Sequence, residues 1–211
     1  MARRKKEPRS VHRRNIALAA GKLFEEKGTE NTSMDDIAKA AGYSKATLYV
    51  YFQNKEEIIS VLAMESMQKL YECISAALEN ERSTKGRYDL ICRGLVQYQV
   101  EFPYYFEVVL GRINIDFDKE ECPREDRETF QIGEAINKKM AQFLEEGIAK
   151  GELRENIAIM PTIFSFWGML SGLIQLAEAK EKYISQEMKL SKQQFLQTGF
   201  DTLYQSVVKG K

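Results

Sequence analysis

The sequence predicts an all-α protein, with a small N-terminal domain of three helices followed by a larger helical domain and about nine helices in total. Apolar residues recur at three- and four-residue spacing along most of the chain. No segment alternates apolar and polar residues as a half-buried strand does, and no internal repeat is present. The most informative stretch is 33–57, where two short helical patterns flank a glycine.

The first helix is predicted over 11–27. Ile16, Ala20 and Phe24, together with Leu23, form one apolar stripe along it, and Gly28 is suited to end it.

A helix-turn-helix is predicted next. Ser33 can cap a second helix whose positive end carries Asp35 and Asp36. Gly42 supplies a left-handed stop, and Ser44 can cap a third helix only two residues later. Such a short turn forces a sharp change of direction, the geometry that places one helix in a DNA groove.

The third helix is predicted to face nucleic acid. Leu48 and Phe52 lie four residues apart and can point to the core, which leaves the rest of the helix as surface. That surface consists of small polar residues, one cation and tyrosines: Lys45, Ala46, Thr47, Tyr49 and Tyr51. Asn54 can cap the next helix, and Lys55 in its first turn can bind a phosphate. The alternative is an ordinary helical hairpin, which leaves the outward aromatic residues unexplained.

Residues 16–59 resemble the DNA-binding domain of the TetR (tetracycline repressor) family. The resemblance rests on Ala20, Leu23-Phe24, Gly28, Thr32-Ser33-Met34, Ile37-Ala38, Ala41-Gly42, Ser44, Thr47-Leu48-Tyr49, Tyr51-Phe52 and Asn54-Lys55-Glu56-Glu57. Family members more often carry glycine at position 46 and histidine at position 51, differences that bear on the operator sequence rather than on the fold.

The resemblance implies a homodimeric transcriptional repressor that is released from a palindromic operator by a small hydrophobic effector. The implied contacts with double-stranded DNA include the capping serine and the small residue of the third helix. They are Thr32, Ser33, Ser44, Lys45, Ala46, Thr47, Tyr49, Tyr51 and Lys55. A helical protein-interaction module without operator binding is the alternative.

Three segments are predicted: a basic flexible arm (1–10), the helix-turn-helix domain (11–54) and, as the resemblance implies, an effector-binding and dimerisation domain, or body (55–211). The net charge is zero overall, but residues 1–60 carry net +4 and the remainder net −4. The arm can follow the minor groove or neutralise phosphate, or it can be a solvated terminus.

Further helices are predicted over 55–80, from about 86 to 102, 103–112, 128–150, 157–177 and 191–208, with loops at 79–86 and 116–127. The segment 157–177 carries no formal charge and contains Gly168-x-x-x-Gly172. A membrane span is disfavoured by Pro161 and by flanks without basic clusters. A helix shared between the body and a second subunit is favoured instead. The expected dimer contacts are Phe164, Gly168, Ser171, Gly172, Gln175, Phe195, Gly199, Phe200 and Leu203.

The resemblance also implies an effector site in the body. The frequent aromatic and sulfur-bearing residues there suit an apolar ligand, although core packing is the commoner role for each of them. The candidates are Phe102, Tyr105, Phe106, Arg112, Met140, Phe143, Phe166 and Trp167.

Catalytic, metal and cofactor sites are not predicted. His12 is the only histidine, the three cysteines lack metal-ligand spacing, and no nucleophile or phosphate-loop motif is present. Cys122 is a weak candidate for a redox-sensing thiol. Reduced thiols and the absence of a signal peptide favour a cytoplasmic protein.

Overall fold

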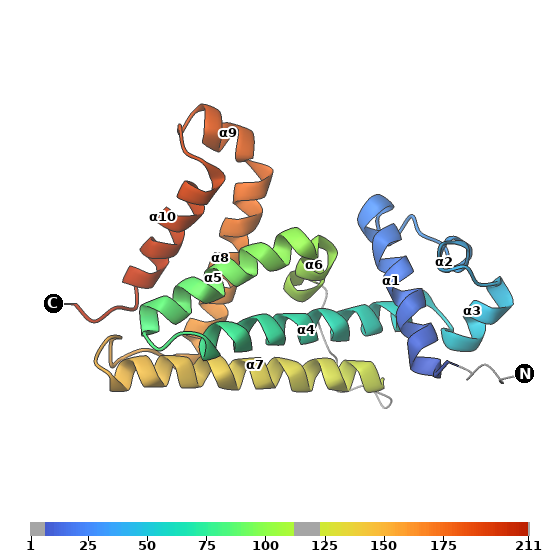
Figure 1. The fold of residues 1–211 in the computed structure, drawn as a ribbon, viewed down its shortest axis with the longest axis horizontal. Coiled ribbons are helices and arrows are strands. Elements are labelled where there is room, and N and C mark those ends of the chain that lie inside the picture. The colour runs from blue at the N-terminus through green and yellow to red at the C-terminus, as the bar shows by residue number, and fades with distance from the viewer. Residues whose placement is uncertain (1–6, 112–122, 211) are drawn as a thin grey trace, which may run out of the picture. The chain divides into compact units, whose positions relative to one another are not determined.

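The computed structural model describes residues 7–111 and 123–210, which form ten α-helices (Figure 1). They belong to two compact units, one comprising 1–68 with 102–130 and the other 69–101 with 131–211. The first unit extends past residue 54, where the sequence places the domain boundary, and it also includes the segment 102–130.

The first unit holds the predicted N-terminal domain. Its helices are α1 (Arg9–Lys27), α2 (Met34–Ala41), α3 (Lys45–Tyr51), the start of α4 (Lys55–Glu79) and α6 (Pro103–Gly111). Ile16, Ile37, Leu48 and Phe52 are fully buried, as their spacing predicts. α1 packs against α2, α3 and α6, so the helix-turn-helix rests on a single supporting helix.

The second unit contains the remaining helices: α5 (Thr84–Glu101), most of α7 (Arg124–Ala149), α8 (Ile159–Ala179), α9 (Glu181–Gln186) and α10 (Lys192–Gln205). α8 and α10 pack against each other, and α9 lies at the turn between them (Figure 1). Ser191 begins α10 with a capping box that includes Gln194.

The structure departs from the predicted elements at several places. α1 begins at Arg9, inside the predicted arm, and α7 begins at Arg124, inside a predicted loop. α9 is absent from the prediction of about nine helices, because its six residues have no side-chain cap and only Ile184 is buried. Within the described residues, pairing of β type is limited to an isolated antiparallel bridge between Leu153 and Val208.

Candidate DNA-binding site

The turn between α2 and α3 has the geometry that the sequence predicts. The Ser33 hydroxyl accepts a hydrogen bond from the Asp36 backbone N–H, and the Asp36 carboxylate accepts one from the Ser33 N–H at 3.0 Å. This capping box and Lys27 hold the pKa of the Asp36 carboxyl well below its usual range. Gly42 ends α2 with φ +75°, a left-handed conformation in which a side chain would be strained.

The polar side chains of α3 are engaged within the protein. The Ser44 and Thr47 hydroxyls lie 2.7 Å apart, and Ser44 also caps the Thr47 N–H. Lys45 Nζ is 2.8 Å from the Asp35 carboxylate, and this contact raises the pKa of Lys45. The charge and hydroxyls predicted to face DNA are therefore held in place, with Ser44, Lys45 and Ala46 exposed and Thr47 half-buried.

Tyr51 is half-buried rather than fully outward. Its ring lies 5.3 Å from the His12 ring and 6.1 Å from the Tyr43 ring, measured between centroids. His12 Nδ1 lies 2.7 Å from the Tyr43 hydroxyl. His12, which has no evident partner in the sequence, is thus a packing residue between α1 and the helix-turn-helix. The predicted outward position of Tyr51 is corrected accordingly.

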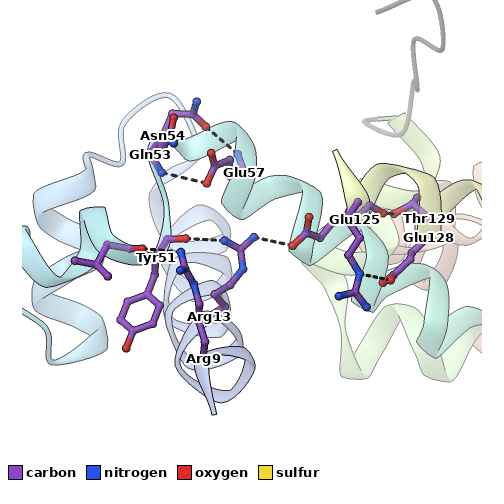
Figure 2. Close-up of polar contacts among 11 residues, drawn as sticks. Arg9, Arg13, Tyr51, Gln53, Asn54, Glu57, Glu125, Glu128 and Thr129 are labelled. Atoms are coloured by element: carbon purple, nitrogen blue, oxygen red, sulfur yellow. Dashed lines mark hydrogen bonds and ion pairs between the residues drawn. The ribbon is translucent and has the colours of Figure 1, made fainter. Parts of the chain in front are cut away.

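Two arginines of α1 bind the C-terminal end of α3. Arg9 Nη2 donates to the Val50 carbonyl at 2.7 Å, and Arg13 Nη1 donates to the Tyr51 carbonyl at 2.6 Å (Figure 2). The Arg13 guanidinium also lies 4.3 Å above the Phe52 ring. A helix ends with unpaired carbonyls, so cations at this point stabilise it and fix its orientation.

Arg13 also connects this end of α3 to α7. Its Nη2 donates to Glu125 Oε1 at 2.7 Å, with both side chains about four-fifths buried (Figure 2). In the same unit, Glu65 of α4 accepts a hydrogen bond from the Tyr105 hydroxyl at 2.9 Å and pairs with Arg14 at 3.2 Å. These roles of the arginines were not predicted from the sequence. The one available signal is the four-residue spacing of Arg9 and Arg13, which places both on one helix face.

Thr32 and Lys55, predicted to lie near the DNA backbone, support the turn. Thr32 is buried and its hydroxyl donates to the Gly28 carbonyl at 2.8 Å. Lys55 is half-buried and donates to the Thr29 carbonyl at 2.9 Å. Asn54 caps α4 by accepting the Glu57 N–H, which confirms the predicted cap (Figure 2).

Residues 16–62 match the family model of the bacterial regulatory proteins of the TetR family. The chain belongs to the TetR family. It is a helix-turn-helix transcriptional regulator, and because such regulators are not enzymes, the prediction of a non-enzymatic protein is confirmed.

The similar proteins span most of this TetR family chain. The HTH-type transcriptional regulator TtgR of Pseudomonas putida is 26% identical over 182 residues, covering 83% of this chain and 84% of the relative. The fatty acid metabolism regulator protein of Bacillus subtilis is 24% identical over 151 residues, covering 68% and 72%. The fold is similar to the crystal structure of FadR from Bacillus subtilis in complex with stearoyl-CoA. The TM-score is 0.64 at 20% identity, and the match covers 90% of this chain and 97% of FadR.

An apolar cavity lies within the second unit of this TetR family regulator. Its volume is about 40 Å³, and it is lined by Tyr88, Ile91, Met140, Phe143, Leu144, Leu153, Thr162, Ile163, Phe166, Leu170, Tyr204 and Val207. Three predicted effector residues, Met140, Phe143 and Phe166, are among them. The other nine lining residues were not predicted. Five of them, Tyr88, Ile91, Leu153, Tyr204 and Val207, come from segments that the fold alone brings together.

The other predicted effector residues lie elsewhere. Phe102 and Tyr105 stack with their ring centroids 5.8 Å apart in the first unit, where Tyr105 bonds Glu65 and Phe106 is buried. Trp167 is half-buried on α8 and does not line the cavity. Arg112 and Cys122 lie outside the described residues. Within those residues, no group of three or more His, Cys, Asp or Glu side chains is placed to hold a metal.

α8 exposes an apolar stripe. Met160, Phe164, Gly168, Gly172 and Leu176 recur every four residues and are all exposed. A side chain at either glycine would meet no atom within 4 Å. α8 is also the one described helix that is long and apolar enough to cross a membrane by length and composition alone, with a mean hydropathy of 1.4.

The remaining predicted dimer residues divide between surface and core. Gln175 is exposed, and Phe195 and Leu203 are half-buried. Ser171 and Phe200 are buried within the single chain, and the backbone of Gly199 is approached by Leu173 of the same chain. Ser171, Gly199 and Phe200 thus serve the α8–α10 packing of one subunit.

Proposed function

We propose that this protein is a homodimeric cytoplasmic repressor that binds a palindromic operator through α3 and releases it when a hydrophobic effector enters the body. The observation that carries the proposal is the outward face of α3, which is fixed at its C-terminal end by Arg9 and Arg13. A rigid helix that presents unpaired side chains to solvent is suited to the major groove.

The proposed DNA contacts come from two kinds of residue. Tyr49, Ala46 and Lys45 are exposed on α3 and can approach base edges and phosphates, with Ser33 and Ser44 at the helix starts. Thr47 and Tyr51 are half-buried at its edges, and Thr32 and Lys55 act by holding the turn that presents the helix. One helix-turn-helix domain covers too few base pairs to select a genomic site, so two such domains on a palindrome are required.

A gel-shift assay with the DNA that flanks the protein's own coding region tests operator binding. The wild-type protein should bind this DNA in preference to random duplex. Tyr49→Ala should weaken binding by roughly tenfold or more, because it removes the largest exposed side chain of the reading face. The matched control is Tyr183→Ala, an exposed tyrosine of α9. Equal binding of operator and random duplex by all three proteins would contradict the proposal.

The cavity supports an apolar effector. Its lining is formed mainly by aliphatic and aromatic side chains. Its volume of about 40 Å³ is far below the roughly 300–1,000 Å³ of typical ligand pockets. Binding of a large ligand therefore requires the surrounding helices to move apart. This movement changes the conformation of the second unit. Because the relative from Bacillus subtilis is a fatty acid metabolism regulator and FadR is seen with stearoyl-CoA, we propose a fatty acyl chain as the effector.

Thermal unfolding and gel shifts with stearoyl-CoA test the effector. The thioester should raise Tm and reduce operator binding of the wild-type protein, since a ligand that binds the folded state stabilises it. Ile163→Phe, which fills the cavity from α8, should abolish both responses while leaving operator binding intact. If coenzyme A without the acyl chain acts equally well, or if Ile163→Phe responds like the wild type, the cavity is not the effector site.

A further inference from the structure

We propose that Val50, with Ala46 beside it, reads the methyl group of a thymine in each half-site of the operator. The inference rests on the proposed function, because it requires α3 to lie in the major groove. Val50 is not among the DNA contacts predicted from the sequence, and the base that it selects is thymine.

The outward face of α3 is apolar at its centre. Ala46, Tyr49 and Val50 are spaced by three and four residues, so they share one side of the helix. Val50 is 62% exposed and Tyr49 is 45% exposed. A β-branched side chain is a poor choice for an exposed position in a seven-residue helix, on grounds of both helix propensity and solvation. Its presence there is explained if the side chain is covered by a partner.

Polar readout by the rest of α3 is restricted by contacts inside the protein. Lys45 is paired with Asp35, the hydroxyls of Ser44 and Thr47 bond each other, and Tyr51 packs against His12. Among the described residues of α3, the side chains that project outward without a hydrogen bond are Ala46, Tyr49 and Val50. The central part of the reading surface is therefore made of methyl groups and an aromatic ring.

Arg9 fixes the position of Val50. Its guanidinium donates to the Val50 carbonyl at 2.7 Å, and Arg13 donates to the next carbonyl, that of Tyr51. These bonds hold the backbone of the last turn, so the Val50 methyl groups occupy a defined place relative to α1. A short-range apolar contact can discriminate between bases only if the side chain is held in this way.

The major groove offers one partner for a methyl face. Among the base edges, only thymine carries a methyl group, whereas guanine, adenine and cytosine present acceptors or donors that Val50 cannot pair. Placing valine against those polar edges would leave them without a hydrogen-bonding partner. The chemistry of the face therefore selects a thymine at the base pair opposite Val50.

The test begins with selection of duplexes from a randomised pool by the full-length protein. Each thymine of the selected sequence is then replaced by deoxyuridine, which keeps the base pairing and removes only the methyl group. For the wild-type protein, one such replacement in a half-site should weaken binding about fourfold, the value of one buried methyl or methylene group. Val50→Ala should bind the thymine and deoxyuridine duplexes within about 1.5-fold of each other, because its apolar surface is too short to reach the methyl group.

Two controls isolate the contact. Val100→Ala removes the same atoms from a valine of α5 that is 64% exposed, and it should retain the full thymine preference of the wild type. Thymine replacements outside the half-sites should have no effect on any of the proteins.

The outcomes separate this inference from the proposed function. Selection of a palindrome in which no thymine replacement affects the wild type would overturn the thymine inference alone. A deoxyuridine effect that is the same in the wild type and in Val50→Ala would remove Val50 from the role. Failure to enrich any sequence would overturn the proposed operator binding and the inference with it.

Discussion

Phe52→Ala is expected to lower the free energy of unfolding of the N-terminal helices by about 3–5 kcal/mol and to abolish operator binding. Phe52 is fully buried directly after α3, and its ring lies under the Arg13 guanidinium. Removal of the ring leaves a cavity beneath the recognition helix and takes away the surface on which Arg13 rests. Urea unfolding followed by far-ultraviolet circular dichroism measures the loss.

Val50→Ala is the matched control for this variant. It truncates an apolar residue only two positions away, but Val50 is exposed, so the free energy of unfolding should change by no more than about 0.5 kcal/mol. Phe52→Leu retains most of the buried volume and should lie between the two. A loss below about 1 kcal/mol for Phe52→Ala would show that the ring does not hold the helix-turn-helix in place.

Phe164→Asp is expected to convert the proposed dimer to a monomer and to weaken operator binding by about a hundredfold or more. Phe164 is 60% exposed in the α8 stripe, next to Gly168 and Gly172, which allow another backbone to approach closely. A carboxylate buried in this interface without a partner is strongly unfavourable. Once the two subunits separate, the binding of one helix-turn-helix domain no longer keeps the other at high effective concentration near the second half-site.

Sedimentation velocity and gel shifts on the same samples measure mass and affinity together. Val100→Asp places the same charge at an equally exposed apolar residue of α5 and should change neither quantity. A charge at Phe200, by contrast, is unsuited to this experiment because that residue is buried inside one chain. An unchanged dimer mass for Phe164→Asp would exclude the α8 stripe as the interface.

Local signals explain why much of the fold was predictable. The capping residues Ser33, Ser44 and Asn54 and the left-handed Gly42 act within a few residues of their own positions. Their hydrogen bonds therefore depend only on residues that are close together in the sequence. α9 lacks such signals, since its first residues make no side-chain cap, and it exists because Ile184 is buried between longer helices.

The sequence by itself determined the all-α class, the helix-turn-helix and the family, because periodicity, caps and a short motif are properties of neighbouring residues. Only the tertiary structure decided that Arg9 and Arg13 bind the end of α3, that Tyr51 packs inward on His12, and that Phe200 belongs to the core. These contacts join residues about 40 positions apart or depend on which side of a helix meets another helix. Packing between helices, rather than the propensity of any one of them, settles such pairings and leaves Val50 on the outside.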